Sequence, residues 1–143
     1  MEKSIKQITK TFETFATGHK IISDFKSNVV QKNFAQNWKY PLMYCVTGSA
    51  NFQPGQVRLG MDIYFLDLPG SEENYTQKLS DMLKITDDFY TYFNTNEASY
   101  GFYFSDDVVA EPVILAFEDT VIGYRIPITI QVKMMNNETE IPI

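Results

Sequence analysis

The sequence predicts an α+β protein with a mainly antiparallel sheet, on which an N-terminal helix and a central helix pack. Three observations lead to this prediction. Apolar residues recur at helical spacing in two stretches, they alternate strictly in two others, and a proline–glycine turn separates two apolar runs. The chain has 143 residues, which is the usual size of one domain. We therefore expect a single domain with helices on one face of a sheet.

The first helix is predicted from an apolar stripe whose members are three and four residues apart: Ile5, Ile8, Phe12, Phe15, His19 and Ile22. The pattern blurs after Ser27, and residues 33–37 indicate the end of the helix. The second helix is predicted to begin at Ser71, whose hydroxyl is expected to cap it, and to continue to about Asn94.

The strands form two groups. Residues 40–47 and 57–65 predict an antiparallel hairpin joined by a long loop, residues 48–56, with Pro54-Gly55 as its turn. Three C-terminal strands are predicted at residues 100–104, 113–117 and 122–132. Because Pro127 has no N–H to donate, the last strand is expected to lie at an edge or to bulge there.

Charge divides the chain. The formal net charge is -6, but residues 1–40 contain seven lysines and three acidic residues, a balance of +4. Residues 41–143 contain five basic and fifteen acidic residues, a balance of -10. Either the basic segment docks on the acidic body of the same chain, or each faces a different partner. The overall acidity argues against a general nucleic-acid binder.

These patterns predict a helical arm (1–37), an α+β body (38–135) and an extended tail (136–143). A single cysteine excludes an internal disulfide. No apolar run approaches the ~18 residues of a membrane span, and the first residues lack the apolar core of a signal peptide. We expect a protein that does not contact a membrane.

No residue pattern predicts a catalytic site. His19 is the only histidine and lies on the apolar stripe, which favours a packed or interfacial side chain. Cys45 lies in an apolar strand and is expected to be buried and inert. The acidic pairs at 87–88 and 106–107 are interpreted as solvated charge, and Trp38 as a packing residue. We expect no enzyme activity, no cofactor and no metal.

Several short strings carry a resemblance to a known family. Tyr40-Pro41-Leu42 opens the first strand of the hairpin, and Phe65-Leu66-Asp67 leads to a helix that contains Leu79-Ser80-Asp81. An acidic turn and a glycine–aromatic pair follow in residues 117–124, and the chain ends in Ile141-Pro142-Ile143. In this order and spacing, from about residue 38 to the end, the chain resembles the tail-completion or tail-terminator proteins of tailed bacteriophages.

The resemblance implies a structural virion protein that forms a ring, typically a hexamer, and catalyses no reaction. The ring would lie at the head-proximal end of the tail or in the neck, after assembly in the host cytoplasm. It would terminate the tail tube and join that tube, or an adjacent neck ring, to the head-completion and portal proteins. DNA would pass through its centre only as cargo.

Contacts between subunits or with neighbouring rings are expected at the basic helix, at the loops 48–56 and 105–111, and at the tail. The candidate residues are Lys3, Lys6, Lys10, Phe52, Pro54, Asp106, Asp107, Arg125, Pro127, Ile141 and Ile143. The alternative is a small soluble adaptor or inhibitor, without enzyme activity, that binds a single phage or host protein.

Overall fold

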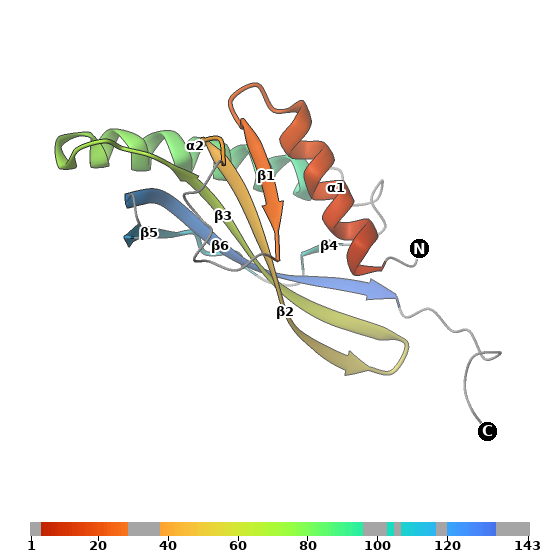
Figure 1. The fold of residues 1–143 in the computed structure, drawn as a ribbon. Coiled ribbons are helices and arrows are strands. Elements are labelled where there is room, and N and C mark those ends of the chain that lie inside the picture. Colours follow the sequence, from red (N-terminus) through yellow and green to blue (C-terminus); the bar gives the residue numbers. More distant parts are fainter. Residues whose placement is uncertain (1–3, 29–37, 96–102, 105–106, 117–119, 134–143) are drawn as a thin grey trace.

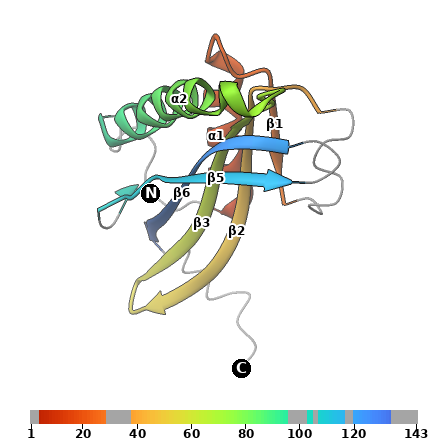
Figure 2. The ribbon, with the colours of Figure 1, turned by 90° about the vertical axis from the view of Figure 1, so that its left-hand side faces the viewer.

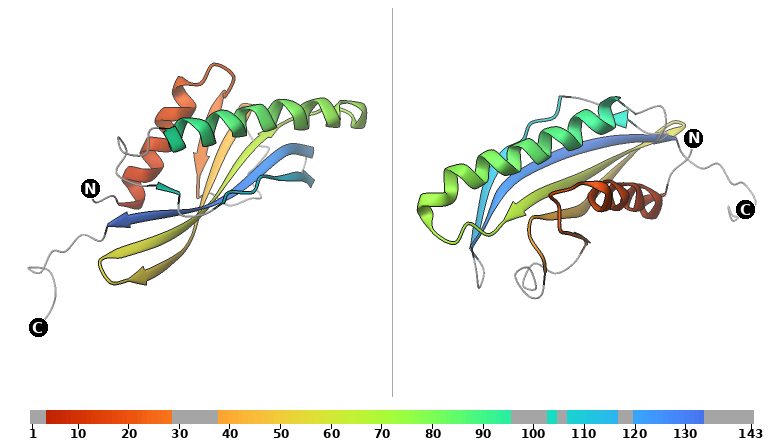
Figure 3. Two further views of the ribbon diagram at one scale, coloured as in Figure 1. Left: turned by 180° about the vertical axis from the view of Figure 1, so that it is seen from behind. Right: turned by 90° about the horizontal axis from the view of Figure 1, so that it is seen from above.

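A six-stranded sheet carries two helices on one of its faces (Figures 1 and 3). The computed structural model describes residues 4–28, 38–95, 103–104, 107–116 and 120–133. In chain order its elements are α1 (Ile5–Gly18), β1 (Asp24–Ser27), β2 (Leu42–Gln53), β3 (Gln56–Asp67), the 3-10 turn η2 (Glu72–Asn74), α2 (Tyr75–Thr95), β4 (Tyr103–Phe104), β5 (Glu111–Ala116) and β6 (Thr120–Lys133).

The strands follow the order β1, β2, β3, β6, and both β4 and β5 pair with the outer side of β6. Among the described strands, β1 pairs with β2 in parallel and the other pairs are antiparallel. The predicted α+β class with a mainly antiparallel sheet is confirmed, as are the hairpin and the three C-terminal strands.

The longest pairing in the sheet joins β3 to β6. All 12 residues of β3 have a partner in β6, from Gln56 opposite Lys133 to Asp67 opposite Ile122. Alternate residues of both strands face the helices, because side chains of a strand point to opposite faces in turn. The predicted alternation in both strands is therefore confirmed.

The core between the sheet and the helices is rich in aromatic rings. Phe12 of α1 lies edge-on to Phe89 and Phe93 of α2, with ring centroids 5.3 and 5.2 Å apart. Phe89 also contacts Phe65 of β3, at 5.5 Å between centroids. Burying each of these side chains contributes roughly 1.5–3 kcal/mol, so this cluster fixes both helices on the sheet.

The N-terminal helix is shorter than predicted. It begins at Ile5 after the capping residue Ser4, whose side chain accepts a hydrogen bond from the N–H of Gln7, and it ends at Gly18. Residues 24–27 do not continue the helix but form β1, a parallel edge strand against β2. The helical spacing continued past Gly18 because Ile22, which lies beyond the end of the helix, is buried in the same core. The predicted helix end at 33–37 lies outside the described residues.

The loop of the hairpin is also much shorter than predicted. β2 and β3 pair as far as Gln53 and Gln56, so only Pro54 and Gly55 form the turn, with φ of 78° at Gly55. The ladder continues through residues 48–49 because these two residues lie opposite one residue of β3 as a β-bulge. The predicted turn at Pro54-Gly55 is confirmed, but Gly48 and Ser49, which were predicted to begin the loop, form a bulge within the strand.

The start of the central helix differs in detail from the prediction. Ser71 makes no side-chain capping bond, and its backbone carbonyl accepts the N–H of Asn74 in the turn η2. The helix then extends to Thr95, close to the predicted end at Asn94. Lys78 in its first turns forms an ion pair of 3.0 Å with Asp67, which attaches the helix to the end of β3.

The last strand is not an edge strand along its length. On its outer side β6 pairs with β5 at residues 120–125 and with β4 at residues 130–131. Pro127 lies between these two paired stretches and opposite Asp62 of β3 on the inner side. The proline therefore occupies an interruption in the outer ladder, where its missing N–H costs no strand pairing.

Gly123 of β6 is buried opposite Leu66 of β3, where no space remains for a side chain. A Cβ atom at Gly123 would overlap the carbonyl oxygen of Phe65. We expect Gly123→Ala to lower the free energy of unfolding by roughly 3 kcal/mol or more, because neither backbone can shift without breaking the β3–β6 ladder. Urea denaturation followed by circular dichroism measures this change.

Gly18→Ala is the matched control, because nothing lies within 4 Å of a Cβ atom added at Gly18. We expect it to change the free energy of unfolding by no more than about 1 kcal/mol. Equal unfolding midpoints for Gly123→Ala and the wild type would show that the two backbones do not approach as described.

Candidate functional site: the hairpin, the sheet edges and the opposite face

The hairpin of β2 and β3 extends beyond the helices as a curved arm (Figure 1). It bends at the bulge, where a Cβ on Gly48 would come within 3.1 Å of the carbonyl oxygen of Gly60. Near its tip Phe52 is 68% exposed, and Pro54 in the turn is exposed as well. An exposed aromatic side chain on a projecting hairpin is a typical contact point for another protein.

Within the part of the chain that the structure describes, the outer edge of β2 is open over its distal half. β1 covers residues 42–45, and Asn28 then extends this cover by one step. The N–H of Asn28 donates to the carbonyl of Cys45, and its side-chain oxygen accepts the N–H of Thr47. Among the described residues, no strand pairs with this edge from residue 48 to the tip.

The second open edge is that of β5, on the other side of the sheet. β5 pairs with β6 through one edge only, as far as the described strands show (Figure 2). Ile114 in this strand is 54% exposed, and Val109 just before it is 63% exposed. An edge strand with exposed apolar side chains is a ready template for pairing with another chain.

The face opposite the helices carries an ion-pair cluster. Arg125 of β6 donates to Asp62 of β3 at 3.1 Å and to Glu111 of β5 at 3.0 Å, and thereby connects three strands. Tyr64 lies beside this cluster. Burial, reinforced by the Asp62 carboxylate and opposed by Arg125, raises the pKa of Tyr64 above its ordinary value. The hydroxyl therefore keeps its proton at neutral pH.

A small apolar cluster lies next to these charges on the same face. Leu42, Tyr44 and Leu66 are buried in it. The rings of Trp38 and Tyr64 pack against Tyr44, with centroids 6.1 and 5.8 Å from it. Trp38 is thus a packing residue, as predicted.

His19 connects the two helices. Its Nδ1 accepts the N–H of Ile21 at 3.2 Å, so the ring proton is on Nε2, which donates to Asp88 at 2.9 Å. The ring also packs against Phe15, with centroids 5.6 Å apart. His19 is therefore a packed residue, as predicted. The prediction that Asp88 is only a solvated charge is wrong, because Asp88 accepts this hydrogen bond.

A pocket of about 260 Å³ lies beside His19 and is also lined by Tyr92.

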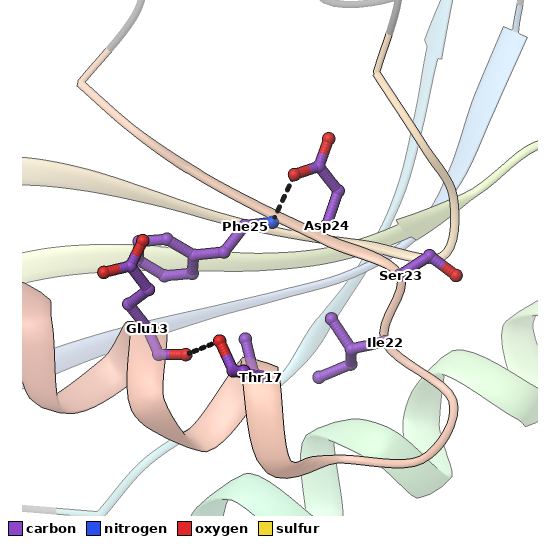
Figure 4. A pocket seen from close by; sticks show the side chains of 7 residues that line it. Glu13, Thr17, Ile22, Ser23, Asp24 and Phe25 are labelled. Carbon is purple, nitrogen blue, oxygen red and sulfur yellow. Dashed lines mark hydrogen bonds between the residues drawn. The ribbon is translucent and has the colours of Figure 1, made fainter.

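A second pocket, of about 280 Å³, lies between α1 and β1 (Figure 4). Its two carboxylates already have partners. Glu13 binds Lys10 at 3.1 Å, and Asp24 accepts backbone N–H groups from Phe25 and Lys39 at 2.9 and 3.2 Å. These bonds leave no converging pair of acids for proton transfer in this pocket.

Cys45 is fully buried in β2, and burial raises the pKa of its thiol. Its protonated state and its position in the core make it a packing residue. Among the described residues, no group of three or more histidine, cysteine, aspartate or glutamate side chains is placed to bind a metal ion.

The candidate contact residues do not form one cluster. Lys6 and Lys10 are exposed on α1, and Phe52 and Pro54 are exposed at the hairpin tip. Arg125 is held in the ion-pair cluster on the opposite face. The remaining described candidates are Asp107, which is exposed, and Pro127, which is half-buried in β6. Lys3, Asp106, Ile141 and Ile143 lie outside the described residues.

Sequence reasoning missed the partners of Arg125. Alternation already placed Asp62 on the polar face of one strand and Arg125 on the polar face of another. However, nothing in the sequence shows that β3 lies beside β6, or that Glu111 of β5 reaches the same guanidinium. Only the pairing of the three strands brings these charges together.

No protein-family profile matches this chain, and no curated protein sequence matches it. None of the described helices is both long enough and apolar enough to cross a membrane.

The Arg125 cluster predicts a measurable contribution to stability. Arg125→Met leaves two carboxylates side by side without their shared cation, and we expect a loss of about 1 kcal/mol in the free energy of unfolding. The amide protons of β5 should also exchange faster, because Glu111 loses its link to the rest of the sheet. Urea denaturation and hydrogen exchange measure the two effects.

Lys10→Met is the control, because it removes a cation with a single carboxylate partner from a position whose side chain is 74% exposed. This substitution should change stability by less than about 0.5 kcal/mol. Equal losses for the two variants, or unchanged exchange in β5, would contradict a linking role for Arg125.

Proposed function

We propose that this protein is a structural subunit of a tailed-bacteriophage virion and that six copies of it assemble into a ring. The ring lies at the head-proximal end of the tail or in the neck. There it terminates the tail tube and joins the tube or a neighbouring ring to the head-completion and portal proteins, while DNA passes through the lumen. The subunits are made and assembled in the host cytoplasm and catalyse no reaction.

The main support is the pair of open sheet edges on opposite sides of the subunit. The open part of β2 carries small and polar residues such as Gly48, Ser49 and Asn51, whereas β5 presents the apolar Ile114. The two edges therefore differ in the side chains that they carry. Two different surfaces on one subunit favour head-to-tail contacts, and such contacts produce closed rings when the rotation closes.

The charge distribution is a second support. Lys6 and Lys10 point away from the body on the exposed side of α1. Within the described chain, the hydrogen bond from His19 to Asp88 joins residues 1–40 to an acid of the body, and no lysine of that segment forms an ion pair with such an acid. The sequence left two possibilities: the basic segment docks on the acidic body of its own chain, or it faces another molecule. The second possibility is therefore favoured. Complementary charges of this kind speed and orient docking.

Three of the strings that carry the phage resemblance lie among the described residues. Residues 40–42 lead into β2, residues 65–67 end β3, and residues 79–81 lie on α2. Acidic residues on the exposed side of η2 and α2 suit a ring through which DNA slides without binding, because they repel phosphates.

The alternative is a non-enzymatic adaptor or inhibitor that binds one phage or host protein. The exposed Phe52 on the projecting hairpin is the feature that favours it, because one hairpin inserted in one partner needs no self-association.

Molar mass and particle shape distinguish the ring subunit from the adaptor or inhibitor. Light scattering coupled to size exclusion, applied to the full chain over a wide concentration range, should detect a species of six times the 16.5 kDa subunit mass. Electron microscopy of that species, or of particles to which the protein is added, should show rings with a central channel. A monomer at every concentration that adds no ring to tail or neck particles would overturn the proposal.

Charge reversal tests the docking of the basic helix. The triple variant Lys3→Glu, Lys6→Glu, Lys10→Glu should assemble more weakly than the wild type, and the difference should shrink at high salt because ions screen exposed charges. Light scattering at low and high ionic strength measures assembly.

The control reverses three other exposed lysines, Lys20, Lys39 and Lys84, so that the net charge is the same in both variants. It should assemble better than the α1 variant at low salt. Equal behaviour of the two variants, or a defect independent of salt, would refute docking through the basic face of α1.

A further inference from the structure

Arg58 lies on the face of the sheet opposite the helices, in the part of β3 that belongs to the hairpin arm. Its neighbours Val57 and Leu59 pack in the core on the helix side, so its own side chain points the other way. Arg58 is half-buried, and its buried Nε atom has no hydrogen-bond partner. None of the ion pairs among the described residues includes it. Because buried charged groups are normally paired, Arg58 is a candidate anchor for a group outside the subunit.

The outer end of the Arg58 guanidinium is accessible. Within the described part of the chain neither Nη atom forms a hydrogen bond, and neither is buried. Asp62 and Glu111 on the same face are already bound to Arg125. A planar guanidinium binds a carboxylate through two parallel N–H bonds. A carboxylate suits this site better than a nucleic-acid phosphate, because the net charge of -6 repels nucleic acid.

Glu72, in the turn η2, is an acid of the required kind. Its side chain is exposed and has no hydrogen-bond or ion-pair partner among the described residues. The next residue, Glu73, accepts the hydroxyl of Ser71 at 3.4 Å. Leu68, in the same connection between β3 and α2, is 39% exposed. This connection therefore offers a carboxylate and an apolar side chain to another protein.

Arg58 and Glu72 lie at opposite ends of the subunit. From Arg58 to its end at Asp67, β3 spans roughly 30 Å at ~3.3 Å per residue, and Glu72 lies beyond that end. Figure 1 shows the hairpin tip and the start of α2 at opposite ends of the molecule. No side chain spans this distance, so the two charges of one copy cannot meet each other.

We propose that Arg58 of one copy binds the carboxylate of Glu72 in the next copy. This inference rests on the proposed ring and deepens it, because it names a pair of charges that joins neighbouring subunits. One end of each subunit supplies the guanidinium and the other end supplies the carboxylate. The contact is therefore head-to-tail and can repeat around a ring. Binding also gives the Arg58 guanidinium the acceptor that it lacks within the subunit.

Charge reversal of each partner in the full chain tests the contact. Arg58→Glu and Glu72→Arg each place like charges opposite one another, so each should raise the protein concentration needed for half-assembly about tenfold or more. Asp87→Arg is the matched control, because Asp87 is an exposed acid of α2 and the charge change equals that of Glu72→Arg. It should assemble like the wild type. Light scattering over a range of concentrations measures assembly.

Mixing the two defective variants gives a sharper result. Where they alternate around a ring of six, the native pair and the charge-reversed pair follow each other, so every contact again joins opposite charges. The mixture should assemble about as well as the wild type, whereas Arg58→Glu mixed with Asp87→Arg should not. If both variants are folded by circular dichroism and their mixture assembles no better than either alone, the proposed contact is overturned.

Neutral substitutions keep the test valid if a reversed charge disturbs the fold. Arg58→Gln and Glu72→Gln should each weaken assembly. Combining them in one chain should weaken it by less than the product of the two separate effects, because both substitutions remove the same contact. A double variant whose effect equals that product would contradict the pairing.

Arginine side-chain resonances separate this inference from the ring proposal. The chain has two arginines, so Arg125→Met assigns the two Nε–H signals. The Arg58 signal should shift as the protein concentration rises, and Glu72→Gln should abolish the shift. If rings form while this signal stays constant and both reversal variants assemble normally, the contact is wrong and the ring remains. If no ring forms but the signal shows the shift that depends on Glu72, the contact remains and the ring is wrong.

Discussion

The rest of the structure depends on the uninterrupted ladder between β3 and β6. Every residue of β3 is paired in this ladder, and the core-facing side chains of β3 and β6 form the apolar surface on which Phe12 and Phe89 pack. The ladder also decides what lies on each side of the sheet, because β2 and β1 follow β3 while β4 and β5 follow β6. Gly123 is needed in this ladder because a Cβ atom there would overlap the carbonyl oxygen of Phe65.

This arrangement has a direct consequence for assembly. A sheet built outward from a central pair has two different outer edges, and among the described residues both are partly unpaired. On one side the pairing of β1 and Asn28 with β2 ends at Thr47, and no described strand pairs with the rest of that edge. On the other side β5 is held to the sheet through Arg125, while its outer edge carries Ile114. A subunit of this kind is suited to contacts between unlike surfaces.

The charges reinforce the same conclusion. The ion pairs among the described residues lie across strands, as in Arg125 with Asp62, along α1, as in Lys10 with Glu13, or between α2 and the end of β3, as in Lys78 with Asp67. Lys6 lies opposite the buried stripe of α1 and faces solvent. The exposed lysines of α1 are therefore available for the docking that we propose, since charges of opposite sign attract over long range.

The sequence by itself determined the fold class, the hairpin turn at Pro54-Gly55 and the core-facing residues of β3 and β6, because local periodicity encodes which face is buried. It also predicted that His19 and Cys45 are packing residues. The tertiary structure alone decided that residues 24–27 form a parallel strand, that β6 is interior, and which partners Arg125 binds. These features depend on segments far apart in the chain becoming neighbours, and no spacing within a single segment encodes that adjacency.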